Sequence, residues 1–541
     1  MRILPFIGLA LGLAATPSYG QATADLILTG GRVFTADPAR PTAEALAIRG
    51  ERIVAVGSSA DISRLTGPAT RRLDLQGRVV TPGFNDAHNH FSPLPAGEQL
   101  RFTGMEPNWD ETAQAIRQAA AQVPAGTWIF GSVGAQVVLD ERVTRAALDE
   151  LAPRHPVLLS AYYGHGYVAN SAALPKLGIA EEEPDPLGGH YEREAGSRRV
   201  NGRYWEYAQW KTYRALAAQV TDEAAVRELR QLGEEASRLG ITSVQLFSAL
   251  PIGRFVRLLE QARLPIRVRA IPFPTTSPRG RDQSELRELA GLRPQQPTLT
   301  VSGVKWVLDG TPHERGAALR RSYADRPGWQ GKLNFGPPEI ARMVQEAQQA
   351  NQQLLLHCAG DQSAAAVLQA LESYRPKVDW PARRVRIEHG DGVVGDLLPR
   401  ARALGVVVVQ NPAHFTEPVV FQQRWGTGMQ PLRSLLTAGV PLALGSDGPL
   451  NPFLNVMLAT LTPSNPAEAI SREQAVQAYT RGSAFAEFAE KQKGTLAPGM
   501  LADVAVLSQD IFAVPPPQLP GTSSVLTIVG GQIVYDAQVL K

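Results

Sequence analysis

Two histidines that stand one residue apart are the first feature of this sequence that could bind a metal ion. His88 and His90 follow an apolar run and a Pro-Gly turn in the stretch RVVTPGFNDAHNHF, residues 78–91, of a chain with only nine histidines in 541 residues. In a β-strand, side chains two positions apart point to the same face, and their Cα atoms lie about 6.6 Å apart. Two such imidazoles can share one ion at the zinc–nitrogen distance of about 2.0–2.1 Å. The pair alone is equally consistent with two hydrogen-bonded histidines and no metal.

Three further polar side chains stand where other apolar runs end. His357 ends the run LLLHCAGD, His389 ends VRIEHGD, and Asp447 ends LALGSDG. If these runs are parallel strands, their carboxyl ends meet on one face, the face on which (β/α)8 barrels build their active sites. Any one of these residues could be an ordinary buried, hydrogen-bonded group. Together with the first two histidines, they indicate a metal centre.

Lys305, in the stretch SGVKWVLDG, is the sixth candidate residue of this centre. Its ammonium group is expected to point into the same crowded site, where burial lowers the pKa of a lysine. A neutral lysine can react with carbon dioxide to give a carbamate, N6-carboxylysine, which can bridge two metal ions as a carboxylate does. The alternative is a lysine that only pairs with Asp309 or Asp447.

The segments that would position these residues alternate between strands and helices. Besides the run that ends at His90, seven runs are typical of strands: residues 241–248, 265–272, 300–310, 352–360, 383–391, 404–412 and 440–448. Helical periodicity separates them, for example over residues 222–240 and 337–353. Eight βα units are what a parallel (β/α)8 TIM barrel requires, so the sequence predicts an α/β fold of this kind.

A large insertion is predicted within the barrel. His90 and Lys305 lie 215 residues apart, yet only two strand candidates stand between them. A barrel averages roughly 30 residues per βα unit, which places an insertion at about residues 95–215, over the mouth of the barrel. Its aromatic residues fit the wall of a pocket and a packed core equally well; they are Trp109, Trp128, Tyr162, Tyr163, Tyr204 and Trp205.

Both ends of the chain carry short β-like runs punctuated by glycine, such as ADLILTGGRVFTAD and VLTIVGGQIVYD. They predict one small β-domain assembled from both termini, with two separate β-decorations as the alternative. The β-domain is expected to comprise residues 21–80 and 495–541, and the barrel with its insertion residues 81–494.

The first twenty residues are predicted to be a secretory signal peptide. The stretch MRILPFIGLALGLAATPSYGQ combines Arg2, an apolar run from Ile3 to Ala15 and small residues up to Gly20. That run is shorter than a transmembrane span. No later segment is apolar and uncharged over about 20 residues, so we expect a soluble mature chain, exported to the periplasm or secreted, with no membrane contact after signal removal.

Composition narrows the classes of partner. Hydrophobic residues make up 44% of the chain and charged residues 19%, which is typical of a folded globular protein. The net charge is +3 and basic residues are scattered among acidic ones, so nucleic-acid binding is not expected. Cys358 is the single cysteine, which excludes an internal disulfide. The expected partner is a small-molecule substrate, and a homodimer is the assembly to be tested.

The motifs resemble those of the amidohydrolase superfamily, in the family 3 branch that includes N-substituted formamide deformylase. The similarity extends from about residue 25 to 536, and the matching text is TPGFNDAHNHF, GVKWVLDGTP, HCAGD, RIEHGD, LGSDGPLNP and KGTLAPGMLADVAVLSQD. The resemblance implies a TIM barrel with a small composite β-sandwich domain. It assigns His88 and His90 to barrel strand 1, Lys305 to strand 4, His357 and His389 to strands 5 and 6, and Asp447 to strand 8.

Two further residues are interpreted through the resemblance. The segment YYGHGYVANSAAL, residues 162–174, resembles the part of such enzymes that brings a histidine to the substrate, which nominates His165. A plain loop histidine is the alternative. Relatives usually carry an aliphatic residue after the strand-5 histidine, where this chain has Cys358. By alternation Cys358 faces the outer helices, so a role in the core is favoured over catalysis.

The six ligand positions imply one or two divalent ions, zinc above all. The metal would lower the pKa of water, Asp447 would accept the proton and pass it to the leaving nitrogen, and the metal or His165 would polarise the substrate carbonyl. We therefore expect hydrolysis of an amide, formamide, carbamate or imide bond in a small molecule. A lactonase or esterase with the same centre is the alternative, and a non-catalytic binding barrel fits the six filled positions less well.

Overall fold

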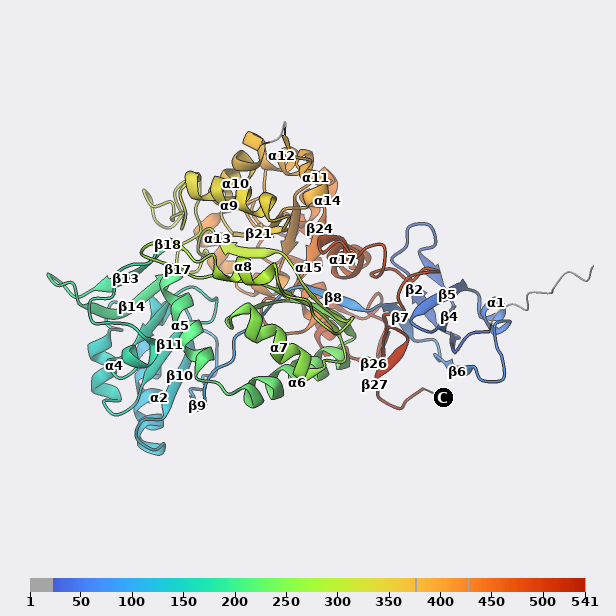
Figure 1. The fold of residues 1–541 in the computed structure, drawn as a ribbon, viewed down its shortest axis with the longest axis horizontal. Helices are drawn as coiled ribbons and strands as arrows, with labels where there is room; N and C mark the ends of the chain where they lie inside the picture. Colours follow the sequence, from blue (N-terminus) through green and yellow to red (C-terminus); the bar gives the residue numbers. More distant parts are fainter. Residues whose placement is uncertain (1–22, 375–376, 427, 541) are drawn as a thin grey trace, which may run out of the picture.

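The computed structural model describes residues 23–374, 377–426 and 428–540 of the chain. Parallel strands and their helices form the centre of an elongated α/β molecule, with two sheets that contain the terminal strands at one end and a mixed six-stranded sheet at the other (Figure 1). The predicted signal peptide, residues 1–20, lies outside the described residues, so export stays a prediction. Among the helices of the described part, none is both long enough and apolar enough to span a bilayer.

Two parallel sheets form the centre of the molecule. The first contains β8 (Phe84–Phe91), β15 (Ile241–Ser248), β16 (Arg267–Ile271) and β19 (Leu299–Val301). The second contains β20 (Val304–Val307), β21 (Leu354–Cys358), β22 (Arg386–His389), β23 (Val407–Gln410) and β24 (Leu442–Leu444). Each of the eight predicted runs therefore contains a strand, and the run at 300–310 is divided between β19 and β20.

Backbone hydrogen bonds link the two parallel sheets at both edges. The Lys305 N–H in β20 donates to the Pro272 carbonyl just after β16, with an N···O distance of 3.0 Å. At the other edge, the Asp447 N–H after β24 donates to the His88 carbonyl in β8, at 2.8 Å. The carboxyl ends of these strands therefore meet on one side of the molecule.

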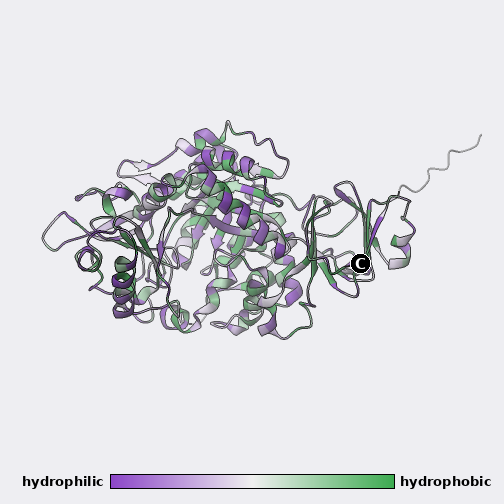
Figure 2. Cartoon of the chain, turned by 90° about the horizontal axis from the view of Figure 1, so that it is seen from below, coloured by the Kyte–Doolittle hydropathy of each residue, from purple (hydrophilic) through white to green (hydrophobic). Residues whose placement is uncertain are grey.

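Helices lie between successive parallel strands along the chain. They include α6 (Asp222–Arg238), α7 (Ile252–Ala262), α9 (Pro337–Gln349), α10 (Asp361–Tyr374), α12 (Leu397–Ala403) and α14 (Leu432–Ala438). Two more helices, α15 (Pro452–Leu461) and α16 (Arg472–Gln477), follow the last parallel strand. In α6, the buried Val226, Leu229 and Ala236 recur at helical spacing. Hydrophilic residues occupy much of the outer helical surface (Figure 2). The helices predicted over residues 222–240 and 337–353 are confirmed as α6 and α9.

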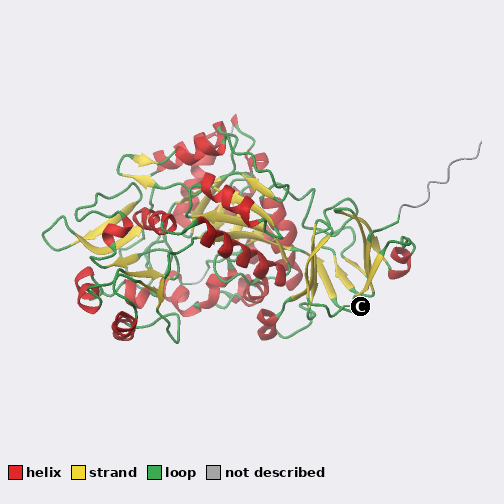
Figure 3. Cartoon of the chain, turned by 60° about the horizontal axis from the view of Figure 1, so that its bottom comes forward, coloured by secondary structure: helices red, strands yellow, loops and turns green. Residues whose placement is uncertain are grey.

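Strands from both ends of the chain share one six-stranded sheet, visible at one end of the molecule in Figure 3. In it, β7 (Val79–Pro82) pairs antiparallel with β25 (Val504–Leu507). Its other strands are β2 (Arg32–Phe34), β3 (Thr42–Ala43), β26 (Ser524–Val529) and β27 (Gln532–Asp536). A four-stranded sheet contains β1 (Leu26–Thr29), β4 (Ala45–Arg49), β5 (Arg52–Gly57) and β6 (Arg71–Asp74). Both sheets contribute to one core, which includes Leu28, Ile53, Val80, Val504 and Ile528.

The predicted insertion, residues 95–215, contains a six-stranded sheet of its own. Its strands are β9 (Gly97–Gln99), β10 (Trp128–Val133), β11 (Val157–Ala161), β12 (Tyr167–Ala169), β13 (Gly189–Arg193) and β14 (Val200–Glu206). Its helices are α2 (Trp109–Gln122), α3 (Ala135–Val138), α4 (Arg145–Leu151) and the start of α5 (Tyr207–Ala218). Tyr162 and Tyr163 line the cavity described below. The other aromatic residues noted in the sequence pack in the cores of the insertion: Trp109, Trp128, Tyr204 and Trp205.

A buried ion pair joins the parallel strands to the terminal sheets. Arg267 in β16 donates two hydrogen bonds to Asp503, from Nε to Oδ2 at 2.8 Å and from Nη2 to Oδ1 at 3.1 Å. The Asp503 carboxylate is 4% exposed and also accepts the Gly530 N–H. Removing this carboxylate would leave a largely buried guanidinium and a buried amide without their acceptor.

We expect Asp503→Ala to lower the free energy of unfolding by about 3 kcal/mol, the loss typical when one member of a buried ion pair is removed. Urea unfolding followed by tryptophan fluorescence measures this change. Glu182→Ala removes an exposed partner of Arg198 and serves as the control, with an expected change within about 0.5 kcal/mol. Equal effects of the two substitutions would contradict a structural role for the buried pair.

Candidate metal centre

One cavity of about 520 Å³ opens at the carboxyl ends of the parallel strands. Lys305 and Asp447 line it, and His88 lies directly against it with no exposed surface. Six of the nine histidines in the chain also line this cavity: His90, His165, His313, His357, His389 and His414. This concentration of imidazoles makes the cavity the candidate functional site.

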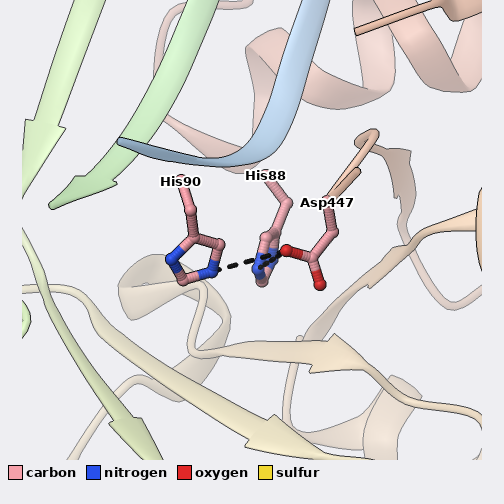
Figure 4. Close-up of side chains that lie close together, drawn as sticks. All are labelled: His88, His90 and Asp447. Atoms are coloured by element: carbon pink, nitrogen blue, oxygen red, sulfur yellow. Dashed lines mark ion pairs between the residues drawn. The ribbon is translucent and has the colours of Figure 1, made fainter. Parts of the chain in front are cut away.

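His88 and His90 lie on β8, and both imidazoles face Asp447 (Figure 4). The Nε2 atoms of His88 and His90 lie 3.6 and 3.4 Å from Asp447 Oδ1. One potential ligand atom from each of the three residues falls within 4.8 Å of the others. The structure thus brings the histidine pair and the predicted strand-8 aspartate together.

The backbone at the end of β24 is shaped to bring Asp447 against β8. Asp447 has a φ of 44°, in the left-handed region that residues other than glycine rarely adopt. A Cβ atom at Gly445 would lie 2.5 Å from the His88 nitrogen, so the close approach of the two strands requires glycine there. The position of the carboxylate therefore depends on both backbone features.

His357, His389 and Lys305 reach the same cavity from β21, β22 and β20. The imidazole centroids of His357 and His389 are 4.3 Å apart, and those of His389 and His88 are 5.0 Å apart. The Lys305 Nζ atom lies 3.0 Å from His88 Nε2 and 4.2 Å from the centroid of the Phe247 ring. All six residues predicted as ligands therefore meet at one place.

Asp309, one of the two carboxylates considered as a partner of Lys305, is held by other groups. It is completely buried and accepts hydrogen bonds from the N–H groups of Ala359 and Gly360 and from the Ser363 hydroxyl. The Lys305 ammonium therefore faces an imidazole and an aromatic ring instead of that carboxylate.

Burial controls the protonation of the cavity groups. Four histidines have a pKa well below the ordinary value, chiefly because burial disfavours the imidazolium ion and secondarily because nearby positive groups repel it: His88, His90, His357 and His389. Burial also lowers the pKa of Lys305 to about 8 and raises the pKa of Asp447. These histidines are consequently neutral near pH 7, which is the form that binds metal ions.

The donor set fits a divalent cation. Neutral imidazole nitrogens and carboxylate oxygens point into the same part of the cavity. These atoms carry lone pairs, and a cation placed between them would bind to several of them at once. Imidazole-rich sets with a carboxylate are typical of zinc and of other first-row divalent metals.

His414 belongs to the site and was missed in the sequence. Its Nε2 atom lies 3.5 Å from Asp447 Oδ2, and its ring stacks on His389 with centroids 5.4 Å apart. These three residues form a second group of potential ligand atoms within 4.8 Å of one another. The sequence signal that could have identified His414 is the stretch NPAHF, at the carboxyl end of the strand predicted at residues 404–412.

His165 reaches the cavity from the insertion, on the turn between β11 and β12. Its Nδ1 atom lies 2.8 Å from Glu206 Oε1, and its ring centroid is 5.0 Å from that of His357. Burial disfavours the imidazolium ion, but the charge and hydrogen bond of Glu206 outweigh it and raise the pKa of His165 to about 9. His165 thus lines the cavity as a protonated imidazole near pH 7. Glu206, at the end of β14, was not predicted because no sequence motif marks it.

Cys358 points away from the cavity, as the strand alternation predicted. It is completely buried in the main core, against Ser363 of α10. Burial raises the pKa of its thiol well above the ordinary value, which disfavours the reactive thiolate. A core role is therefore supported over catalysis.

Comparisons with known proteins agree with this geometry. The sequence profile of the amidohydrolase family matches residues 71–535, which confirms the resemblance seen in the motifs. YtcJ of Bacillus subtilis is 28% identical over 94% of this chain and 98% of its own length. N-substituted formamide deformylase of Arthrobacter pascens is 26% identical over 95% of this chain and 98% of its own length.

Two solved structures share the fold at low sequence identity. An uncharacterized metal-dependent hydrolase of Pyrococcus horikoshii has a TM-score of 0.70 at 22% identity, covering 91% of this chain and 99% of that one. An adenosine deaminase of Xanthomonas campestris with bound zinc has a TM-score of 0.55 at 16% identity, covering 96% of this chain and 95% of that one. The α/β architecture is therefore that of metal-dependent hydrolases.

We expect the His88→Ala/His90→Ala double variant to contain less metal than the wild-type protein, because it removes two of the converging nitrogens. Elemental analysis of gently purified protein measures this, with one or two divalent ions per chain expected in the wild type. His190→Ala, at an exposed histidine away from the cavity, is the control and should leave the metal content unchanged. A double variant with wild-type metal content would show that the ligands lie elsewhere.

Proposed function

Because the chain belongs to the amidohydrolase family, we propose that it hydrolyses a carbon–nitrogen bond of a small molecule with the help of divalent metal. The observation that carries this proposal is the convergence of neutral imidazoles, Lys305 and Asp447 on one cavity at the strand ends. The bond is an amide, formamide, carbamate or imide. Water adds to the carbonyl carbon and the carbon–nitrogen bond breaks. The products are a carboxylic acid, or from a carbamate a carbonic acid monoester, and an amine or amide.

We further propose that the two parallel sheets are the halves of one (β/α)8 barrel. The order of the strands and the hydrogen bonds at both edges support this interpretation. The terminal strands would then form the composite β-sandwich domain, residues 21–80 and 495–541, beside a barrel over 81–494. In this arrangement the cavity occupies the mouth of the barrel.

The proposed metal ligands come from five strands or strand ends. They are His88, His90, Lys305, His357, His389 and Asp447, and the position of His414 adds it to the set. Zinc is the preferred ion because it favours imidazole-rich sites. When bound, the metal would activate water and polarise the substrate carbonyl.

Proton transfer is assigned to Asp447 and stabilisation of the carbonyl oxygen to His165. Asp447 lies within 3.6 Å of the Nε2 atoms of His90 and His414, at the centre of the site, where its carboxylate can take a proton from water and pass it to the leaving nitrogen. The protonated His165, held by Glu206, donates a hydrogen bond to the oxygen on which negative charge develops.

The cavity walls favour a substrate with an apolar part. Aromatic rings line much of the cavity wall: Tyr162, Tyr163, Trp210, Tyr213, Phe273 and Phe421. A panel of N-formyl and N-acyl amines, with matched esters and lactones, tests the reaction class. Faster hydrolysis of the esters would favour the lactonase or esterase alternative, and turnover of no compound on metallated protein would favour a binding function.

We expect Asp447→Asn to reduce kcat by about 10²–10⁴-fold, the loss typical when general acid–base catalysis is removed. The substitution keeps the shape of the side chain and removes the base. Steady-state kinetics on the best amide of the panel measure the effect, and Asp396→Asn, at an exposed carboxylate outside the cavity, is the matched control. Near-normal turnover of the Asp447 variant would contradict its role.

Lys305 is proposed to be carboxylated. Its Nζ atom lies 3.0 Å from His88 Nε2, so a cationic lysine would compete with a metal ion for the same nitrogen lone pair. With a pKa of about 8, lowered by burial, part of the lysine is the free amine near neutral pH. The amine nitrogen attacks carbon dioxide, a nitrogen–carbon bond forms, and one proton leaves to solvent. The product carries negative charge and offers two oxygens for metal binding.

Lys305→Ala is expected to lose at least one metal ion per chain and most of the activity, and short carboxylates such as formate or acetate should restore part of both. Wild-type protein loaded with ¹³C-bicarbonate and metal should show a carbamate carbon signal that the variant lacks. Lys176→Ala, at an exposed lysine, is the control and should resemble the wild type. Fully active, metallated wild-type enzyme without a carbamate signal would refute the modification.

A further inference from the structure

The carboxylate of Glu388 lies behind the His88 imidazole, on the side of the ring opposite the proposed ligand atom. His88 Nδ1 and Glu388 Oε2 are 2.6 Å apart, and both side chains are completely buried. Since a carboxylate accepts the hydrogen bond, Nδ1 carries the hydrogen. The lone pair of His88 is therefore on Nε2, which faces Asp447 and Lys305.

Arg386 holds the Glu388 carboxylate in place. Its guanidinium group donates from Nε to Oε1 at 2.7 Å and from Nη2 to Oε2 at 2.8 Å. The same group donates to the Ala87 carbonyl at 2.7 Å and to the Gln245 side chain. Arg386 is also completely buried, so this two-pronged ion pair is screened from water. Glu388 thus has one fixed orientation and a permanent counter-charge.

The backbone of β22 places the proposed ligand and its support at consecutive positions. Arg386 and Glu388 share one face of the strand, and alternation would direct His389 to the opposite face. His389 instead has a φ of 66°, outside the strand region, and its side chain lines the cavity. Strain of this kind in a non-glycine residue persists where the surrounding structure imposes it, typically at functional sites. At the end of this one strand, His389 therefore lines the cavity while Glu388 contacts the Nδ1 side of the His88 ring.

We propose that Glu388, held by Arg386, is a positioning residue that fixes the tautomer and ring orientation of His88 for metal binding. The inference rests on the metal centre proposed above. A carboxylate that accepts the second ring hydrogen also makes an imidazole more basic, and loss of such a partner typically weakens metal affinity by about 10–100-fold. Glu388 does not touch the substrate or the metal, and it acts only through His88.

Metal binding by the purified full chain, without substrate, tests the proposal. We expect Glu388→Gln to weaken Zn²⁺ affinity by about 10–100-fold, measured by competition with a chromophoric chelator. The visible absorption spectrum of the Co²⁺ form should change, because the ligand field of His88 changes. Glu388→Asp keeps the charge on a shorter side chain and should recover part of the affinity. Glu487→Gln is the matched control, since Glu487 is also a buried carboxylate that pairs with a cation, Lys493, and contacts no proposed ligand.

A second variant separates positioning from general damage to the fold. Glu388→Gln leaves Arg386 buried without its anion, whereas Arg386→Met/Glu388→Gln removes both charges. The double variant should show the same loss of Zn²⁺ affinity, because the carboxylate behind His88 is still missing. Restored affinity in the double variant, or wild-type affinity and an unchanged Co²⁺ spectrum in Glu388→Gln, would overturn the proposal. Wild-type protein that binds no Zn²⁺ would overturn the proposed metal centre and this inference with it.

Discussion

The burial of neutral imidazoles is the constraint on which the rest of the structure depends. Moving an ion from water into a protein interior is unfavourable by several kcal/mol. The chain meets this penalty in two ways. The four histidines predicted as ligands are neutral, since burial lowers their pKa. Buried charges that persist have fixed partners, as Arg386 has Glu388 and His165 has Glu206. Asp447 instead lies 3.4–3.8 Å from the Nε2 atoms of four histidines, and Lys305 lies 3.0 Å from that of His88. These two are the groups proposed for proton transfer and for carboxylation.

The same constraint explains where the backbone is strained. Three non-glycine residues with positive φ surround the cavity: Glu206 at 55°, His389 at 66° and Asp447 at 44°. Each such conformation is unfavourable by about 1–3 kcal/mol, and each turns a polar side chain toward the site or toward one of its histidines. Parallel pairing with β21 and β23 holds the strand of His389, antiparallel pairing with β12 and β13 holds that of Glu206, and the hydrogen bond from the Asp447 N–H to the His88 carbonyl holds Asp447. The positions of these polar side chains are thus maintained although the local backbone conformation is unfavourable, as is usual at functional sites.

The sequence predicted those parts of the site that follow from local rules. Polar residues at the ends of apolar runs identified His357, His389 and Asp447, and strand alternation placed His88 and His90 on one face. The same alternation would assign Glu388 and His389 to opposite faces. The sequence does not show the positive φ of His389, so it could not indicate that His389 lines the cavity while Glu388 contacts His88. His414 lies in a short 3-10 helix, Pro412–Thr416, after β23, where the alternation of a strand no longer applies. The pairing of strands within the insertion depends on contacts between distant segments, and the sequence offered no motif for it.

The insertion contributes to the proposed chemistry as well as to the cavity wall. It carries His165 on the turn after β11 and Glu206 at the end of β14, and Asn334, from the loop after β20, donates to Glu206 at 2.8 Å. From the cavity wall, the Tyr162 hydroxyl donates to Glu417 at the start of α13 (Pro418–Trp425). The insertion is therefore tied to loops that follow two different parallel strands. A segment that only selected the substrate could shift without affecting catalysis, whereas a shift here would also move the proposed hydrogen-bond donor. Changes of substrate should for this reason be achieved more readily through wall side chains such as Phe421, which does not belong to the insertion, than through the strands that hold His165.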